Sequence, residues 1–313
     1  MQPLAPVRTP PQHDWIGIAV AGLPGLAAVI ALIFTALSVQ ATNSQLKLAE
    51  QGQITDRYNA AITNLGSASI EVRLGGIYAL QRLMQDSPRD QPTVISVLCA
   101  FVRDRAPAPV TPYGSRTTFP PPPSPDVQAA LTVVTTRNTA NDGHTTVVDL
   151  NHAQLAFAQL YHAPFHGANL FGANLIAANL RGAQLGGAHL EGDNLSSADL
   201  RGATLTNVDL FGANLSSALL GGAHFDHADL RGANLTDADL TGAQLADADL
   251  GSTKLNYARL EHANLIRADL TGAKLIRADL TGAILTHANL TGANLTGADL
   301  TGAKGIRASP PPP

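Results

Sequence analysis

Four polar residues that lie close together in the second half of the chain are the best candidates for chemistry: His224, Asp226, His227 and Asp229. Imidazole and carboxylate groups at this density can hold a divalent metal ion. The alternative interpretation is that they are solvated, outward positions of a segment that accepts any polar residue. We favour the second interpretation, and we expect no catalytic residue, no metal ligand and no cofactor.

Other signatures of enzymes are missing from the sequence. It contains no phosphate-binding glycine loop, no CxxC pair, no GxSxG and no HExxH. Its single cysteine, Cys99, excludes an internal disulfide. The net charge is −4 and the sequence has no basic patch, so we expect no nucleic-acid partner.

The dominant feature of the sequence is a period of five residues. From 150 to 300 every position divisible by five is Leu, except Phe165 and Phe225. The position two residues before each of these, from 153 to 303, is Ala in 28 of 31 cases. Neither a helix, with period 3.6, nor a strand, with period 2, explains this spacing. A fixed short repeat predicts a solenoid.

The residue types suggest how such a chain folds. The recurring Leu and Ala point inward, and the remaining positions face solvent. We therefore expect a buried stack of leucines that includes Leu170, Leu190, Leu210, Leu230, Leu250 and Leu270. Glycine in the third position of many corners predicts type II turns, because that position needs a positive φ. Where Ala177, Ser197 or Tyr257 replaces it, we predict a different turn.

The repeated A(N/D)LxG unit resembles the pentapeptide-repeat family. The resemblance covers residues 146–304 and implies a right-handed quadrilateral β-helix, an all-β solenoid with 20 residues per lap. The preceding stretch from GQITDRYNAAITNLG to CAFVRDRAP resembles a segment found before the repeats in actinobacterial, membrane-anchored members. Gyrase-protecting members of the family present regular acidic ribbons as a mimic of DNA.

Residues 20 apart should stack in columns if a lap has 20 residues. One column contains Asp149, Asp209, Asp229, Asp249 and Asp269, and the opposite one contains Asp199, Asp239, Asp279 and Asp299. We expect Arg267 and Arg277 to relieve part of the repulsion between these carboxylates. Phe171 and Phe211 share another column, and Tyr161 lies on the opposite face. Large outward aromatics indicate contact sites, so these three are our candidate protein-contact residues; the alternative is that the Pro-rich linker covers them.

The N-terminal region predicts a membrane anchor. After a tail at 1–14, residues 15–39 carry no charge and are long enough to cross a bilayer as one transmembrane helix. The alternative is a cleaved signal peptide ending at Val39-Gln40-Ala41. Arg8 stands on one side of the segment, Lys47 and Arg57 on the other, so the basic excess favours a cytoplasmic location for the bulk of the chain.

Between the anchor and the repeats we expect three further regions. Residues 43–105 read as an α-helical segment, with Asp90 as the N-cap of its last helix. Residues 106–125 form a Pro-rich linker, and 126–137 form a short helix that caps the first lap of the solenoid. A Pro-rich tail, 305–313, follows the repeats.

These patterns predict a non-catalytic, membrane-anchored scaffold that binds an unknown protein partner. A solenoid offers long regular surfaces and no deep pocket, which suits recognition better than catalysis. One alternative is an acidic DNA mimic that protects a topoisomerase. Another is a metal-dependent protein that uses the cluster from His224 to Asp229. The sequence does not indicate an oligomeric state.

Overall fold

The structure, a computed structural model, describes residues 15–108, 120–143 and 146–305, with side chains from Ala28 onward. The predicted tail 1–14 and most of the Pro-rich linker and C-terminal tail lie outside these residues. The chain divides into one unit that ends at Asp56 and a second that begins at Arg57, and each is described by itself.

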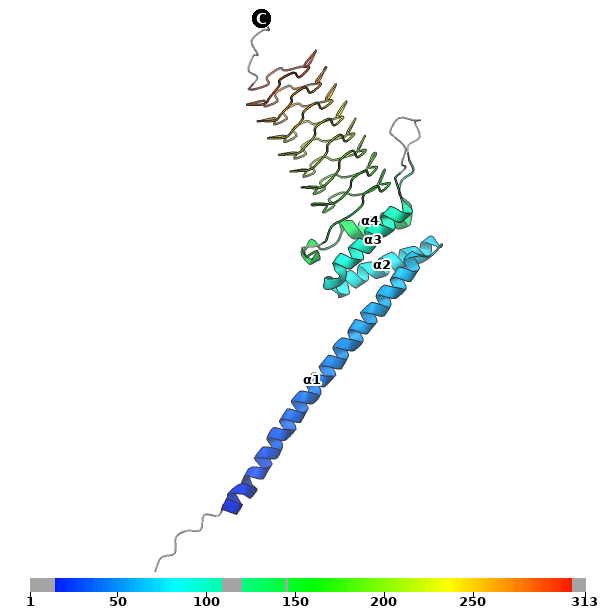
Figure 1. The fold of residues 1–313 in the computed structure, drawn as a ribbon, viewed down its shortest axis with the longest axis vertical. Helices are drawn as coiled ribbons and strands as arrows, with labels where there is room; N and C mark the ends of the chain where they lie inside the picture. Colours follow the sequence, from blue (N-terminus) through cyan, green and yellow to red (C-terminus); the bar gives the residue numbers. More distant parts are fainter. Residues whose placement is uncertain (1–14, 109–119, 144–145, 306–313) are drawn as a thin grey trace, which may run out of the picture. The chain divides into compact units, whose positions relative to one another are not determined.

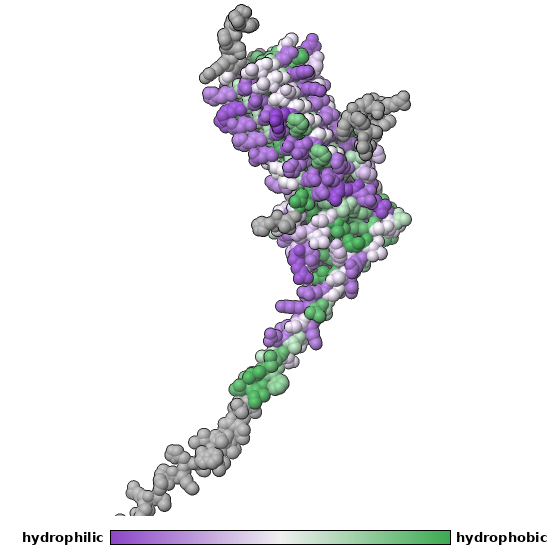
Figure 2. All heavy atoms as spheres, viewed as in Figure 1, coloured by the Kyte–Doolittle hydropathy of each residue, from purple (hydrophilic) through white to green (hydrophobic). Residues whose placement is uncertain are grey.

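Helix α1 runs without interruption from Trp15 to Leu65. It contains the predicted spanning segment 15–39 and the first part of the predicted helical segment, and it continues through residues 40–42 between them. Residues 40–42 include no Pro or Gly, and the Thr42 hydroxyl donates to the Ser38 carbonyl (2.9 Å), which is compatible with a continuing helix. Among the described residues, Ala28–Leu65 is long and apolar enough to cross a bilayer, a property that signal sequences share. Figure 2 shows its hydrophobic part.

The second unit begins with a small helical bundle. After the end of α1 come α2 (Ile70–Asp86), η1 (Pro88–Asp90), α3 (Gln91–Arg105), α4 (Pro125–Thr135) and η2 (Thr139–Asn141). These helices bury a shared apolar core, which includes Ile77, Leu80, Leu83, Val94, Leu98, Val127 and Leu131. The buried Asp126 carboxylate at the start of α4 pairs with Arg73 of α2 (2.6 Å) and so ties these two helices together.

Asp90 is the N-cap residue of α3, as the sequence predicts, but its side chain makes no capping hydrogen bond. It precedes α3, but it belongs to η1 and its backbone is already helical. Its carboxylate accepts a hydrogen bond from the Ser87 hydroxyl (2.5 Å) in place of the first amides of α3.

The repeats form a coil whose lap is 20 residues long. Parallel bridges join each pairing position to the one 20 residues later, from Asp149 with Asn169 to Ile284 with Lys304. Within 146–305 these bridges are isolated, and no extended strand is present. The Leu150 amide donates to the Asn169 carbonyl (2.8 Å), and the same bond recurs around every lap that has a successor. Figure 1 shows the laps stacked one on another.

The inside of the coil is a dry stack of leucines and alanines. The residues at positions divisible by five from 150 to 285 are buried, among them Leu170, Leu190, Leu210, Leu230, Leu250 and Leu270. In the last described lap, Leu290, Leu295 and Leu300 are only half-buried. Three inward positions depart from Ala: Asp193, Val208 and Thr253, and all three are buried.

The corners do not divide into two classes as predicted. The residue at the third position of each four-residue corner, from His152 to Gly302, has a positive φ, whether or not it is glycine. Tyr257 (φ 60°) and Arg277 (φ 56°) adopt the same sign as Gly172 (φ 69°). Closure of the lap requires this conformation at each corner, so the neighbouring laps impose it on residues that rarely adopt it alone.

The first lap is covered on all four sides. Its four pairing positions are 149, 154, 159 and 164, and each is bonded to a segment outside the coil. Arg103 pairs with Asp149 (2.7 Å), and the Ala106 carbonyl accepts from the Gln154 amide (2.6 Å). The two remaining positions are bonded by side chains at and just after α4: Gln128 bonds the backbone of Gln159, and Arg137 donates to the Pro164 carbonyl (3.0 Å).

The first lap is bonded by several segments, whereas the sequence predicts a single capping helix. The predicted capping helix, 126–137, corresponds to α4 and the residues after it, and it supplies two of the four contacts. Pro107, within the predicted linker, pairs with Ala153 in an antiparallel bridge. The backbone groups of the open edge are therefore satisfied by several segments, as buried polar groups require.

Candidate functional site

One column of outward residues on the coil carries two phenylalanines. Because a lap takes 20 residues, Phe171, Glu191, Phe211 and Arg231 occupy equivalent places in four successive laps. The Gly192 amide donates to the Phe211 carbonyl (3.0 Å), so these positions are stacked in adjacent laps. We call these four residues the aromatic column.

Both phenyl rings of the aromatic column are about half exposed. Phe171 is 49% exposed and Phe211 is 53% exposed. The ring of His152 meets Phe171 edge-on, with centroids 5.4 Å apart. The guanidinium carbon of Arg231 lies 5.6 Å from the centroid of Phe211. Each ring is thus supported by a neighbour and still presents apolar surface to solvent. Figure 2 shows a coil face that is mostly hydrophilic or neutral, with only scattered hydrophobic residues.

Two carboxylates lie beside these rings without a Lys or Arg partner among the described residues. Glu191 Oε1 lies 3.2 Å from His189 Nδ1, while its buried Oε2 has no hydrogen-bond partner. Asp209 accepts from the Phe211 amide (3.0 Å). Burial raises the pKa of Asp209, and the adjacent Glu191 carboxylate raises it further. Among the described residues, no Lys or Arg forms an ion pair with either carboxylate.

A third carboxylate lies inside the coil at the same place. Asp193 is fully buried, and burial raises its pKa well above the usual value. Its Oδ1 accepts from the Ala173 amide (3.0 Å), and its Oδ2 has no partner. The corner bond that would join the Gly172 amide to the Glu191 carbonyl, present in the laps on both sides, is missing here. The inward carboxylate thus replaces part of the regular bonding beneath the aromatic column.

The negative charge of the next part of the same face is offset in part by one arginine. Arg231 pairs with Asp229 (2.5 Å) and lies 3.5 Å from Asp249. The hydrogen bond from Arg231 lowers the pKa of Asp229. The same column runs through Asp209, Asp229, Asp249 and Asp269. Asp209 and Asp269, at the two ends of this run, have no Lys or Arg ion-pair partner among the described residues, and Asp209 is the one that lies beside Phe211.

The frequent Asp and Asn residues of these columns also have a local structural role. The Asp229 carboxylate accepts from the amide two residues later (3.0 Å), and Asn234 repeats the pattern (3.2 Å). Asn234 also donates to Asn214 one lap below (3.1 Å). Short side chains that bond their own backbone favour turns. The acidic columns are thus accounted for in large part by the corners.

The arginines that offset the acidic columns are not the predicted pair. Arg201 and Arg231 bind the aspartates two residues before them, and Arg259 lies 3.4 Å from Asp239. Arg267 instead pairs with Asp247, one lap earlier in a different column (2.5 Å). Arg277 lies over the ring of Tyr257. The reason is geometric: both residues occupy corner positions with positive φ, which direct them toward the preceding lap.

Tyr161 lies apart from the aromatic column. It is 60% exposed and contacts the ring of His162, with centroids 6.1 Å apart. Its place is half a lap away from Phe171, on the opposite side of the coil. Sequence reasoning overlooked Tyr257, which is 50% exposed, and Leu219, which is 38% exposed. The same 20-residue arithmetic would have found both.

The predicted polar cluster does not converge. His224 pairs in the ladder with Gln244, while the Asp247 carboxylate near His227 is bound by Arg267 (2.6 Å). Within the described part of the chain, no group of three or more His, Cys, Asp or Glu side chains is arranged to hold a metal ion. The four residues lie on outward positions of successive corners.

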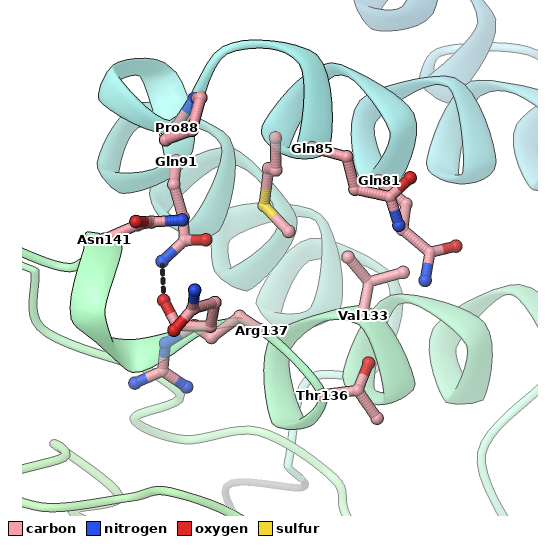
Figure 3. Close-up of a pocket in the computed structure, with 10 residues that line it drawn as sticks. Gln81, Gln85, Pro88, Gln91, Val133, Thr136, Arg137 and Asn141 are labelled. Carbon is pink, nitrogen blue, oxygen red and sulfur yellow. Dashed lines mark hydrogen bonds between the residues drawn. The ribbon is translucent and has the colours of Figure 1, made fainter.

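A pocket in the helical bundle offers a second type of surface. Its volume is about 460 Å³, and its walls come from α2, η1, the start of α3, α4 and η2 (Figure 3). Amides dominate the lining, with Gln91 bonded to Asn138 and Asp142 and with Met84 and Val133 as the apolar part. The lining shows no arrangement of nucleophile and base.

The repeats match one protein family. The family described as Pentapeptide repeats matches in eight copies, at residues 148–175, 173–212, 209–245, 243–282 and 273–304, which together cover half of the chain. Comparison with curated proteins gives no match.

Several solved structures are similar in sequence over the repeats. HetL, a pentapeptide repeat protein involved in heterocyst differentiation regulation from the cyanobacterium Nostoc sp. strain PCC 7120, is 35% identical, with 50% of this chain and 78% of HetL covered and a TM-score of 0.27. A thylakoid-lumen pentapeptide repeat protein of Arabidopsis thaliana is 34% identical, with 38% and 72% covered and a TM-score of 0.15. A trypsin-treated form of QnrB1, a plasmid-mediated fluoroquinolone resistance protein, is 20% identical, with 50% and 87% covered and a TM-score of 0.32. These TM-scores are too low for any functional argument to rest on the likenesses.

Proposed function

This chain belongs to the pentapeptide-repeat family, and on that premise we propose that it is a non-catalytic, membrane-anchored scaffold whose coil binds another protein through the aromatic column. Members of the family are generally structural or interaction proteins. We infer that the coil is the family's right-handed quadrilateral β-helix, which presents flat faces suited to recognition.

The observation that carries the proposal is the exposure of Phe171 and Phe211 in one column. Two rings that are each about half exposed lie about 10 Å apart, two laps at the usual strand spacing. Fully burying such a side chain contributes about 1.5–3 kcal/mol. Aromatic anchors close together on a surface are the usual centre of a protein interface.

Photo-crosslinking in native membranes tests this proposal. One probe replaces Phe171, and its matched control replaces Thr291, which occupies the same column six laps later. We expect adducts to a second protein from position 171 and none from position 291. Adducts that form only from 291 would place the contact at the other end of the coil and contradict the proposal.

Membrane attachment is the second part of the proposal. The uncharged stretch 15–39 and the apolar composition of α1 support a single-pass anchor in the bilayer. Lys47 and Arg57 after the stretch, against Arg8 before it, favour a cytoplasmic location for the repeats. The mass of the mature chain and protease protection in sealed vesicles test both points. Loss of residues 1–41 would indicate a cleaved signal peptide instead.

One observation favours the alternative function of DNA mimicry. Asp209, Asp229, Asp249 and Asp269 form an uninterrupted run of carboxylates in one column. However, Arg231 pairs with two of them, so the run carries less negative charge than its spacing suggests. A gyrase supercoiling assay with the full chain in detergent tests this alternative, and protection of the enzyme at micromolar protein would favour it over a scaffold.

A further inference from the structure

Two carboxylates beside the rings of the aromatic column, Glu191 and Asp209, have no Lys or Arg ion-pair partner in the described part of the chain. Glu191 stands one lap above Phe171 and one lap below Phe211, and Asp209 lies two residues before Phe211. His189 Nδ1 lies 3.2 Å from Glu191 Oε1, the Glu191 Oε2 atom is buried, and Asp209 accepts from the Phe211 amide. In the following laps Arg231 pairs with Asp229 and lies 3.5 Å from Asp249, so Glu191 and Asp209 are the carboxylates without a Lys or Arg partner that lie beside the exposed phenyl rings.

We propose that the aromatic column receives an arginine side chain of the protein partner, whose guanidinium group stacks on the exposed phenyl rings and donates hydrogen bonds to Glu191 and Asp209. This inference rests on the proposed function, because it names the chemistry of the partner at the same surface. Charge complementarity selects this occupant: two carboxylates without a Lys or Arg partner among the described residues lie between and beside two rings that attract cations.

The chain itself contains the contact that the partner would make. Arg231 lies 5.6 Å from the centroid of Phe211, and Arg277 lies 6.0 Å from that of Tyr257 in another column. Guanidinium groups of the chain itself therefore lie over outward aromatic rings of this coil. Phe171 is half exposed and is contacted edge-on by His152, which leaves part of its surface for a guanidinium group from outside.

Arginine fits this surface better than lysine. Its guanidinium is planar, carries five donors in a fixed fork and stacks on aromatic faces, whereas an ammonium group is a compact and strongly hydrated point charge. Two carboxylates on successive laps lie about 5 Å apart along the coil axis. One planar group can therefore donate to both of them while it remains in contact with a ring.

The test uses the full chain in detergent micelles with 4-fluorophenylalanine at position 171. The fluorine resonance is followed while acetyl-Gly-Arg-Gly-amide is added, and the same peptide with citrulline in place of arginine is the uncharged control. We expect a saturable shift with the arginine peptide and none with citrulline. Equal shifts with both peptides would overturn the proposal, because the recognition would not depend on charge.

Variants assign the effect to the named carboxylates. Glu191→Gln should weaken binding of the arginine peptide about tenfold, as expected for loss of a charge-assisted hydrogen bond. Glu261→Gln is the matched control, because Glu261 already has Arg259 as a partner (3.2 Å) on the opposite side of the coil. It should leave binding unchanged. If Glu191→Gln does not fold, Asp209→Asn makes the same test.

The outcomes separate this inference from the proposed function. Crosslinking from position 171 together with no binding of the arginine peptide would refute only the inference that the partner supplies an arginine. The aromatic column would remain the proposed contact surface. Unchanged binding by both Glu191→Gln and Asp209→Asn, or equal weakening by Glu261→Gln, would also refute it. Loss of crosslinking from position 171 would refute the proposed function itself.

Discussion

Replacing the buried Asp193 with alanine should stabilise the protein, and should do so more at high pH than at low pH. Asp193 occupies an inward position where 28 of 31 repeats carry Ala. Its Oδ2 is buried without a partner, which costs about 1–3 kcal/mol. Alanine loses the bonds that the Ala173 and Gly172 amides donate to the carboxylate, but the Gly172 amide can then bond the Glu191 carbonyl as in neighbouring laps and the Ala173 amide keeps its bond to the Leu170 carbonyl (2.8 Å), so neither donor is left unpaired. The net gain should be about 1–3 kcal/mol.

The pH dependence follows from the direction of the pKa shift. Burial raises the pKa of Asp193 in the folded protein, whereas in the unfolded chain an aspartate titrates near ~3.9. Between these two values the folded state binds more protons than the unfolded state. The free energy of unfolding therefore falls as pH rises through that window. The alanine variant lacks this dependence, so its advantage should be small near pH 4 and should grow as pH rises.

Thermal unfolding of the full chain in micelles at pH 4.5 and pH 8 measures this effect. A gain of 1 kcal/mol corresponds to a rise of about 2–4 °C in Tm for a unit of this size. Thr253→Ala is the matched control, because Thr253 is another inward exception but is uncharged and bonded to the carbonyls of Leu230 and Leu250. A shift for Asp193→Ala that is absent, negative or independent of pH would refute the reasoning.

Three further substitutions test the fold by denaturation. Leu230→Asp places an unpaired charge in the dry stack and should destabilise the coil by on the order of 5 kcal/mol, while the outward His227→Asp should change stability little; equal effects would contradict the inward assignment. Gly172→Ala should lower stability more than Gly192→Ala. Both glycines have a φ of +69°, so each alanine carries about 1–2 kcal/mol of backbone strain. Only the Cβ at position 172 would also lie 2.5 Å from an imidazole atom, that of His152. Arg137→Ala breaks a buried ion pair and removes the cover from one side of the first lap, which should cost about 3–5 kcal/mol; a loss below about 1 kcal/mol would show that the cover is dispensable.

The period of five was enough to predict a solenoid with buried leucines, and the resemblance to the pentapeptide-repeat family supplied the 20-residue lap from which the columns follow. Each inward Leu is fixed by its own spacing, so a column such as that of Phe171 and Phe211 can be written down without coordinates. The corners were mispredicted because residue preference was assumed to decide φ. At Tyr257 and Arg277 the ladder bonds on both sides impose the same conformation that glycine adopts.

Features without a period were not predictable in the same way. The cover of the first lap comes from Arg103, Gln128 and Arg137, which lie far from their partners in sequence. The sequence placed Glu191 in the aromatic column, but it did not show that its carboxylate lacks a basic partner while Glu261 has one. That difference depends on which arginine reaches which carboxylate, and only side-chain geometry decides it.

The most direct test of the central claim compares two pairs of exposed aromatic residues. Phe171→Ser combined with Phe211→Ser removes the rings of the aromatic column, and Tyr161→Ser combined with Tyr257→Ser removes a similar area elsewhere on the coil. The measurement is the mass of the complex that contains the chain, after mild solubilisation of native membranes. We predict that the phenylalanine pair reduces the complex to the chain without its partner, and that the tyrosine pair leaves it intact. An intact complex after loss of both phenylalanines would contradict the claim that the aromatic column binds the partner.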